Sequence, residues 1–274
     1  LKVYSIRSHL YCRLYYKTTK KLNPKKNMDL FHFFDIIWLI ITSMKEGYNM
    51  KVYILAVTSA YKDYYCIAGM DEGGNWVRPI SSTQNRFWKK CELTFNEGSD
   101  FIRAGDVIEF RGNAPLQYQH PNHVEDIVVQ KNQLKLVNRL NNLQLINFLE
   151  NKDETEQAFI NTVNAEGRSL CLIKVDSFQH AITQYEVKPP RPKMTFTNSK
   201  FNVDNPRTNN GDYIVKDLVW SDAVLKDLVD KKQAYNDIYL TIGLATPAPY
   251  DGIEYPQVIG LHTSPVIIPT NKVV

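Results

Sequence analysis

The sequence predicts a mostly β fold with a few short helices, arranged as two successive series of strands. Apolar or alternating runs of strand length recur along residues 50–264, and turns rich in Gly, Asn and Asp separate them. Only two stretches space their apolar residues as a helix does, whereas strands need only four to eight such residues. The 274 residues suffice for one large domain or two small ones, and a hydrophobic fraction of 43% is ordinary for a soluble globular protein.

The segment 51–82 carries the strongest strand signals. Residues 52–57 are an apolar run, and the runs 64–70 and 75–80 are separated by Asp71-Glu72-Gly73-Gly74. A glycine pair supplies the positive φ angles that a tight hairpin needs. The second and third runs are therefore expected to be antiparallel neighbours.

The third run places an aromatic ring and a cation on one face. With a period of two, Trp76, Arg78 and Ile80 share a face, and Val77 and Pro79 lie on the other. A Trp and an Arg two residues apart form a platform suited to stacking a flat ring and pairing an anion. The alternative is that Trp76 caps the core and Arg78 pairs with a local carboxylate.

The segments Tyr65-Cys-Ile-Ala-Gly69 and Trp76-Val-Arg-Pro-Ile-Ser81, with the glycine turn between them, resemble the opening of the bacterial dual OB-containing domain family. Residues 239–252, YLTIGLATPAPYDG, are similar to its closing strand, although the stretch between Gly243 and Pro249 is longer than the family pattern and the strand after it contains a His. The resemblance covers residues 50–264. It implies two tandem OB-like β-barrels, at 50–165 and 166–274.

After the hairpin, residues 83–91 interleave cations with rings, in Arg86, Trp88, Lys89 and Lys90. This composition suits single-stranded nucleic acid, because rings stack on bases and cations follow the backbone. The alternative is a surface loop whose rings turn inward and whose lysines are only solvated.

Strands at 106–111, 124–129 and 134–136 are expected to complete the first barrel, followed by a short helix at 142–149. The loop between the first two of these strands contains His120 and His123. No third ligand is evident there, so no metal is expected.

The second series is expected after Asn164–Gly167. Its predicted strands lie at 169–175, 181–187, 194–201, 213–219, 239–244 and 257–261. Residues 189–193 read as a stiff connector or as a basic edge strand. Asp222 is a plausible N-cap for a helix at 223–232.

Residues 1–49 differ from the rest. They hold nine basic and three acidic residues, which leaves 24 and 26 for residues 50–274, so the body is not basic overall. The apolar run 30–41 is too short to span a bilayer, for which roughly 20 residues are needed, and it lacks the features of a secretory signal. A membrane-surface anchor is one alternative. Because Lys45-Glu46-Gly47 can be encoded by a ribosome-binding purine tract, we expect a leader at 1–49 and a native start at Met50.

The sequence has no phosphate-binding glycine loop, nucleophile elbow or zinc-protease motif, and its four cysteines stand alone, as in a reducing, cytoplasmic compartment. We therefore expect a non-catalytic binding protein without a cofactor or metal, whose partner is single-stranded DNA or RNA. A protein-interaction scaffold is the alternative, followed by a metal-dependent nuclease. The predicted nucleic-acid-binding residues are Trp76, Arg78, Arg86, Trp88, Lys89, Lys90, Arg191, Lys193, Phe196 and Arg207.

Overall fold

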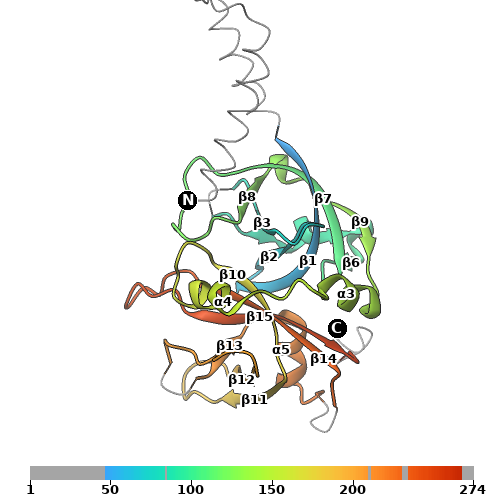
Figure 1. Ribbon diagram of the computed structural model, residues 1–274. Coiled ribbons are helices and arrows are strands. Elements are labelled where there is room, and N and C mark those ends of the chain that lie inside the picture. Colours follow the sequence, from blue (N-terminus) through green and yellow to red (C-terminus); the bar gives the residue numbers. More distant parts are fainter. Residues whose placement is uncertain (1–46, 84, 209–210, 230–233, 267–274) are drawn as a thin grey trace, which may run out of the picture. The chain divides into compact units, whose positions relative to one another are not determined.

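The computed structural model describes residues 47–83, 85–208, 211–229 and 234–266, and their strands and helices belong to one compact unit, Tyr48–Val274. The fold is mostly β, as predicted (Figure 1). The proposed leader lies outside the described residues except for Gly47, Tyr48 and Asn49, and the last two already belong to β1. None of the described helices is long and apolar enough to cross a membrane.

The first sheet closes on itself. Its strands follow the order β1-β2-β3-β8-β7, and β7 pairs back with β1. β3 and β8 run parallel, whereas the other neighbours are antiparallel. β4 (Trp88–Lys89) pairs with β2, and β9 (Lys135–Arg139) extends the sheet beyond β7. The barrel strands are β1 (Tyr48–Tyr61), β2 (Tyr64–Met70), β3 (Trp76–Ile80), β7 (Asp106–Asn113) and β8 (Asp126–Val129).

The second sheet has the same strand order as the first, except that its first strand is divided into two, β10 and β11. β10 pairs with β14, whereas β11 pairs with β12, and the switch lies between Val175, which donates to Ile238 O at 2.9 Å, and Asp176, which donates to Thr197 O at 2.9 Å. β13 and β15 form the parallel pair. The strands are β10 (Leu170–Lys174), β11 (Ser177–Thr183), β12 (Arg191–Thr197), β13 (Tyr213–Val215), β14 (Asp237–Leu244) and β15 (Pro256–Ser264). This repeated order confirms two tandem OB-like barrels.

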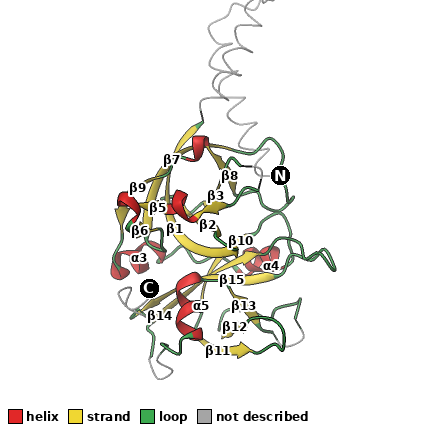
Figure 2. Cartoon of the chain, turned by 180° about the vertical axis from the view of Figure 1, so that it is seen from behind, coloured by secondary structure: helices red, strands yellow, loops and turns green. Residues whose placement is uncertain are grey.

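Short elements occupy the connection from β3 to β7. β5 (Thr94–Phe95) pairs with β6 (Asp100–Phe101), and single 3-10 turns lie at Lys90–Leu93 and Asn96–Gly98; a third, Gln130–Asn132, follows β8. The corresponding connection of the second barrel holds a helix, α5 (Leu218–Leu225), among the strands of that sheet (Figure 2).

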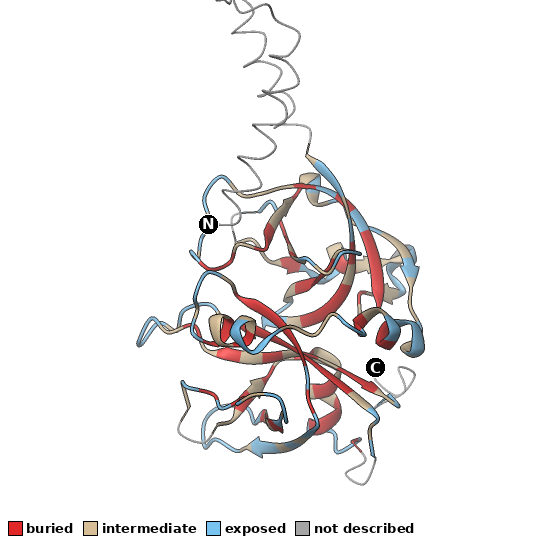
Figure 3. Cartoon of the chain, viewed as in Figure 1, coloured by how far each residue is buried: buried red, intermediate tan, exposed pale blue. Residues whose placement is uncertain are grey.

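Alternation along the strands separates the core from the outer faces (Figure 3). In the first barrel Val77 lies in the core, as the period of two predicts, together with Trp88 and Ile108. In the second barrel Met194 and Tyr213 point into the core from neighbouring strands.

The helices only partly match the sequence prediction. α3 (Asn142–Leu149) has the predicted bounds, and α4 (Glu156–Val163) was not predicted. α5 begins five residues before the predicted helix at 223–232, because Asp217 rather than Asp222 is its N-cap. One oxygen of Asp217 accepts from Trp220 N at 2.7 Å, and the other accepts from Leu261 N at 3.2 Å on β15. The second contact comes from tertiary structure, so local sequence does not reveal it.

One predicted strand was also displaced. β11 ends at Thr183, whereas the prediction was 181–187, and residues 184–190 form an exposed connection to β12. Pairing with β12 fixes the position, since Ser177 lies opposite Thr197.

The outer face of the first barrel's β1, β2 and β3 packs against the second barrel. Leu55 and Met70 share a buried cluster with Leu172 and Tyr239. β15 approaches so closely that a Cβ at Gly260 would lie 2.2 Å from Leu55 O. The two barrels therefore form a joint core.

Candidate nucleic-acid interface

Trp76 lies at the contact between the barrels. Its ring is partly buried and packs against clusters from both barrels. Its Nε1 donates to Glu154 Oε2 at 3.1 Å, and the same carboxylate accepts from Leu172 N at 2.9 Å. The ring is thus committed to packing within the protein.

Arg78 lies on the same face and is tied to the second barrel. Its guanidinium donates to Ser169 Oγ at 2.7 Å and to Asp126 Oδ1 at 3.3 Å, and only 12% of its side chain is exposed. Arg86 reaches the other oxygen of Asp126 at 2.9 Å. Burial raises the pKa of Asp126, and the two guanidinium groups oppose that rise. Both arginines therefore compensate a buried carboxylate.

Two histidines and a glutamate adjoin this ion pair. Arg78 Nη1 lies 2.6 Å from His123 Nδ1, while His120 Nδ1 and His123 Nε2 each lie 3.7 Å from Glu254 Oε1. Asn122 donates to the second oxygen of Glu254. These contacts join the β7–β8 loop of the first barrel to the β14–β15 loop of the second.

The arrangement disfavours a metal. Because an arginine can only donate, His123 Nδ1 must accept, and its proton then resides on Nε2. That proton blocks the nitrogen as a metal ligand. Within the described ranges, no group of three or more His, Cys, Asp or Glu side chains is placed to hold a metal ion.

Acidification is expected to destabilise the protein through buried histidines. Burial and the Arg78 guanidinium lower the pKa of His123 to about 2, and burial lowers the pKa of His262 to about 4, both below the usual 6.5. Since the unfolded chain binds these protons more tightly, each histidine lowers the free energy of unfolding by ~1.4 kcal/mol per pH unit as the pH falls below 6.5. Burial raises the pKa of Asp217 to about 6, so its protonation below pH 6 acts in the opposite direction and offsets one histidine.

The net expectation is a loss of about 2–3 kcal/mol between pH 6.5 and pH 5, measured by urea unfolding at constant salt. A His262→Gln variant should show a shallower pH dependence. A free energy of unfolding that is constant from pH 7 to pH 5 would contradict the burial of neutral histidines.

The basic and aromatic segment 83–91 divides between core and surface. Trp88 is fully buried, and its Nε1 donates to Pro79 O at 2.8 Å. On either side of it, Phe87 is half-buried and Lys89 is exposed, as alternation around β4 requires. The outward ring of this segment is therefore Phe87, and Trp88 offers no ring face to a ligand.

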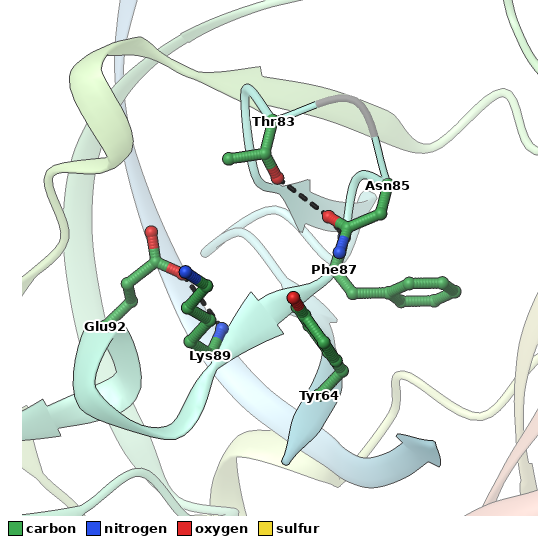
Figure 4. A pocket seen from close by; sticks show the side chains of 6 residues that line it. All are labelled: Tyr64, Thr83, Asn85, Phe87, Lys89 and Glu92. Carbon is green, nitrogen blue, oxygen red and sulfur yellow. Dashed lines mark hydrogen bonds between the residues drawn. The ribbon is translucent and has the colours of Figure 1, made fainter. Parts of the chain in front are cut away.

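A surface pocket of about 410 Å³ opens beside this segment. Figure 4 shows its lining side chains, which come from the start of β2 and from the segment 83–92: Tyr64, Thr83, Asn85, Phe87, Lys89 and Glu92. Asn85 Oδ1 accepts from Thr83 Oγ1 at 2.8 Å, and Glu92 Oε2 accepts from Lys89 N at 2.8 Å. The second oxygen of Glu92 accepts from Asn132 Nδ2 at 2.9 Å, so this carboxylate holds the wall of the pocket together.

Two aromatic rings line this pocket, those of Tyr64 and Phe87, and the ring of Tyr61 packs against both. Tyr61 stacks on Tyr64 with 4.8 Å between ring centroids, and Phe87 meets Tyr61 edge-on at 5.9 Å. Tyr61 and Tyr64 flank the two-residue turn between β1 and β2, and Lys62 in that turn is exposed. Rings, a lysine and an amide thus line one opening, and this set can stack a planar group and pair with an anion.

The pocket and nearly all of both barrels lie within a stretch that identifies the family. Residues 50–261 match the family model of the dual OB-containing domain. The chain belongs to this family. A search of curated proteins found no match. OB barrels bind oligonucleotides with the face of strands 2 and 3 and with the loops joining strands 1–2 and 4–5. In this dual OB-containing domain that face of the first barrel is covered, but its β1–β2 turn borders the open pocket.

The predicted residues on the second barrel have separate environments. Phe196 is buried against Tyr213, with ring centroids 4.8 Å apart. Arg207 Nε donates to Val163 O at 3.1 Å, at the end of α4. Lys193 Nζ pairs with Asp212 at 3.3 Å, and Arg191 is exposed. Arg191 and Lys193 thus lie on the outer face of β12, whereas Phe196 and Arg207 are held by contacts within the protein.

The structure brings Lys89 to the pocket with two rings that sequence reasoning did not select, Tyr64 and Phe87, and a third, Tyr61, packs against them. The sequence could have indicated Phe87, because adjacent residues of a strand point to opposite faces and only one of Phe87 and Trp88 can be exposed. The tyrosines required knowledge that the β1–β2 turn lies beside β4. Lys90 is exposed next to this wall.

Proposed function

We propose that this dual OB-containing domain is a non-catalytic binding module for single-stranded nucleic acid, and that the pocket beside the β1–β2 turn receives a base. The observation that carries the proposal is that the rings of Tyr64 and Phe87 line a pocket together with Lys89, while Tyr61 packs against both rings. Aromatic faces stack on any base, and a neighbouring cation pairs with the backbone phosphate.

The size and composition of the pocket support this function. A volume of about 410 Å³ is within the range of small-ligand pockets. Lys89 forms no ion pair with any residue of the described ranges, so its ammonium group is available to a phosphate. The exposed Lys62 and Lys90 adjoin the pocket in sequence. Among the described cysteines Cys66, Cys91 and Cys171 are free thiols, which supports a reducing, cytoplasmic setting.

Binding is expected to weaken at least about fivefold when Phe87 is replaced with alanine, because base–aromatic stacking contributes about 1–3 kcal/mol per base. The measurement is fluorescence anisotropy of a labelled single-stranded oligonucleotide, as DNA and as RNA, with the full chain. The Lys89→Met variant should lower the slope of log affinity against log salt by about one unit, as the loss of one phosphate contact does.

Tyr250→Ala is the matched control, since Tyr250 is an aromatic residue that is 79% exposed on the second barrel. All variants retain residues 1–46, so the charge of that segment does not affect the comparison. Equal affinities for the wild type, Phe87→Ala and Tyr250→Ala would refute a base-stacking role for the pocket.

A protein-interaction role is the second candidate, and one observation favours it. Leu116 is fully exposed and Tyr250 nearly so, and they lie in the two loops that Asn122 and Glu254 connect. A contiguous patch of exposed apolar side chains marks a protein contact, and residues on two connected loops can contribute to one patch. Such binding would be insensitive to salt and would be lost in Tyr250→Ala but not in Phe87→Ala.

A further inference from the structure

Two cations face each other across β12 and β13 of the second barrel. Lys193 pairs with Ile214, and Met194 pairs with Tyr213, in antiparallel register. Continuing this register by two residues, one residue past the end of β13, places Arg191 opposite Lys216. Because Met194 and Tyr213 point into the core, the alternate residues Arg191 and Lys216 point outward from the same face.

Neither cation has a carboxylate partner among the described residues. The acidic groups nearest to Lys216 in sequence are already bound elsewhere. Asp212 pairs with Lys193 at 3.3 Å, and both oxygens of Asp217 accept backbone N–H groups of Trp220 and Leu261. Arg191 instead lies over the ring of Tyr185, with 5.7 Å from its guanidinium carbon to the ring centroid.

This pairing carries an electrostatic cost. Like charges directly opposite on neighbouring strands destabilise a sheet. Lys216 is also half-buried, so its ammonium group has lost part of its hydration. Burial, followed by repulsion from Arg191, lowers the pKa of Lys216. An anion between the two groups would remove the repulsion and replace the lost hydration.

We propose that Arg191 and Lys216 form a phosphate-binding site on the outer face of β12 and β13. The guanidinium offers a fork of N–H donors to two phosphate oxygens, and the half-buried ammonium supplies the second charge. The corresponding face of the first barrel is covered by the second barrel, whereas this one is open. The site is separate from the aromatic pocket and does not depend on the function proposed for it.

The test uses Lys216→Met and Arg191→Gln in the full chain, with inorganic phosphate as the probe. Calorimetric titration should show phosphate binding to the wild type and at least tenfold weaker binding to each variant. Thermal unfolding should show that phosphate raises the midpoint of the wild type more than chloride of equal ionic strength does, because a ligand stabilises the state that binds it. Without phosphate, Lys216→Met should unfold at a higher temperature than the wild type, since it removes a half-buried, repelled charge.

Lys226→Met is the matched control. Lys226 lies on the same barrel and pairs with Asp222 at 2.8 Å, so its loss should leave phosphate binding unchanged. Equal phosphate affinity in the wild type and Arg191→Gln would overturn the proposal. Arg191 is exposed, so its variant remains informative even if Lys216→Met does not fold.

The source of the phosphate is resolved by a second comparison. If the site holds nucleic-acid backbone, a single-stranded oligonucleotide should compete with inorganic phosphate, and Arg191→Gln should weaken both. If it holds a free phosphorylated molecule, a nucleoside 5′-monophosphate should compete and the oligonucleotide should not. If the wild type binds inorganic phosphate but no single-stranded oligonucleotide, the function proposed for the pocket is refuted and this site stands.

Discussion

Replacing Arg78 with alanine is expected to lower the free energy of unfolding by about 3 kcal/mol, the lower end of the range for breaking a buried ion pair. The variant loses hydrogen bonds to Ser169 and Asp126 and leaves His123 Nδ1 without its donor. Arg86 still pairs with Asp126, which keeps part of the charge compensation. Urea unfolding of the full chain at pH 7 measures the difference.

Arg103→Ala is the control for this prediction. The Arg103 side chain is 37% exposed and lies 4.0 Å from Asp106, which Arg139 also binds, so its loss should cost less than about 1 kcal/mol. If Arg78→Ala is as stable as Arg103→Ala, the guanidinium is not essential to the contact between the barrels. If such a stable variant also loses oligonucleotide binding, Arg78 is a ligand-binding residue.

The joint core changes where a ligand can bind. A solitary OB barrel presents its second and third strands to a ligand, but here Trp76 and Arg78 on that face contact Glu154 and Ser169. The aromatic pocket at the β1–β2 turn and the cation pair on β12 and β13 are both outside this contact. The contact between the barrels thus covers the face of the first barrel that a solitary OB barrel uses for binding, and it leaves these two other surfaces open.

Local sequence predicted the strands well where turn chemistry marked their ends. β2 has the predicted bounds, because the turn at residues 71–75 has a strong signature: Gly74 adopts φ +83°, and Asp71 Oδ1 accepts from Asn75 N at 2.8 Å. α5 was misplaced, since both Asp217 and Asp222 are acceptable caps and only the contact of Asp217 with Leu261 distinguishes them.

The site was harder to predict because its contacts join distant parts of the chain. The sequence identified Trp76 and Arg78 as neighbours on one face, but their partners Glu154 and Ser169 are 78 and 91 residues away. Lys89 was selected together with Trp88, and the fold separates them onto opposite sides of β4. Composition located the segment, while the direction of each side chain required the pairing of β4 with β2.

Replacing Trp88 with alanine is expected to cost about 3–5 kcal/mol of unfolding free energy, the range for deleting a large buried aromatic side chain. The ring is fully buried in the first barrel, and its loss also removes the hydrogen bond to Pro79 O. Phe87→Ala, one residue away, removes a half-buried ring and should cost less than about 1 kcal/mol while it weakens oligonucleotide binding. Chemical unfolding and anisotropy on both variants separate the two roles. If Trp88→Ala keeps full stability and loses oligonucleotide binding, Trp88 rather than Phe87 stacks on the base, and the packing role assigned to Trp88 is wrong.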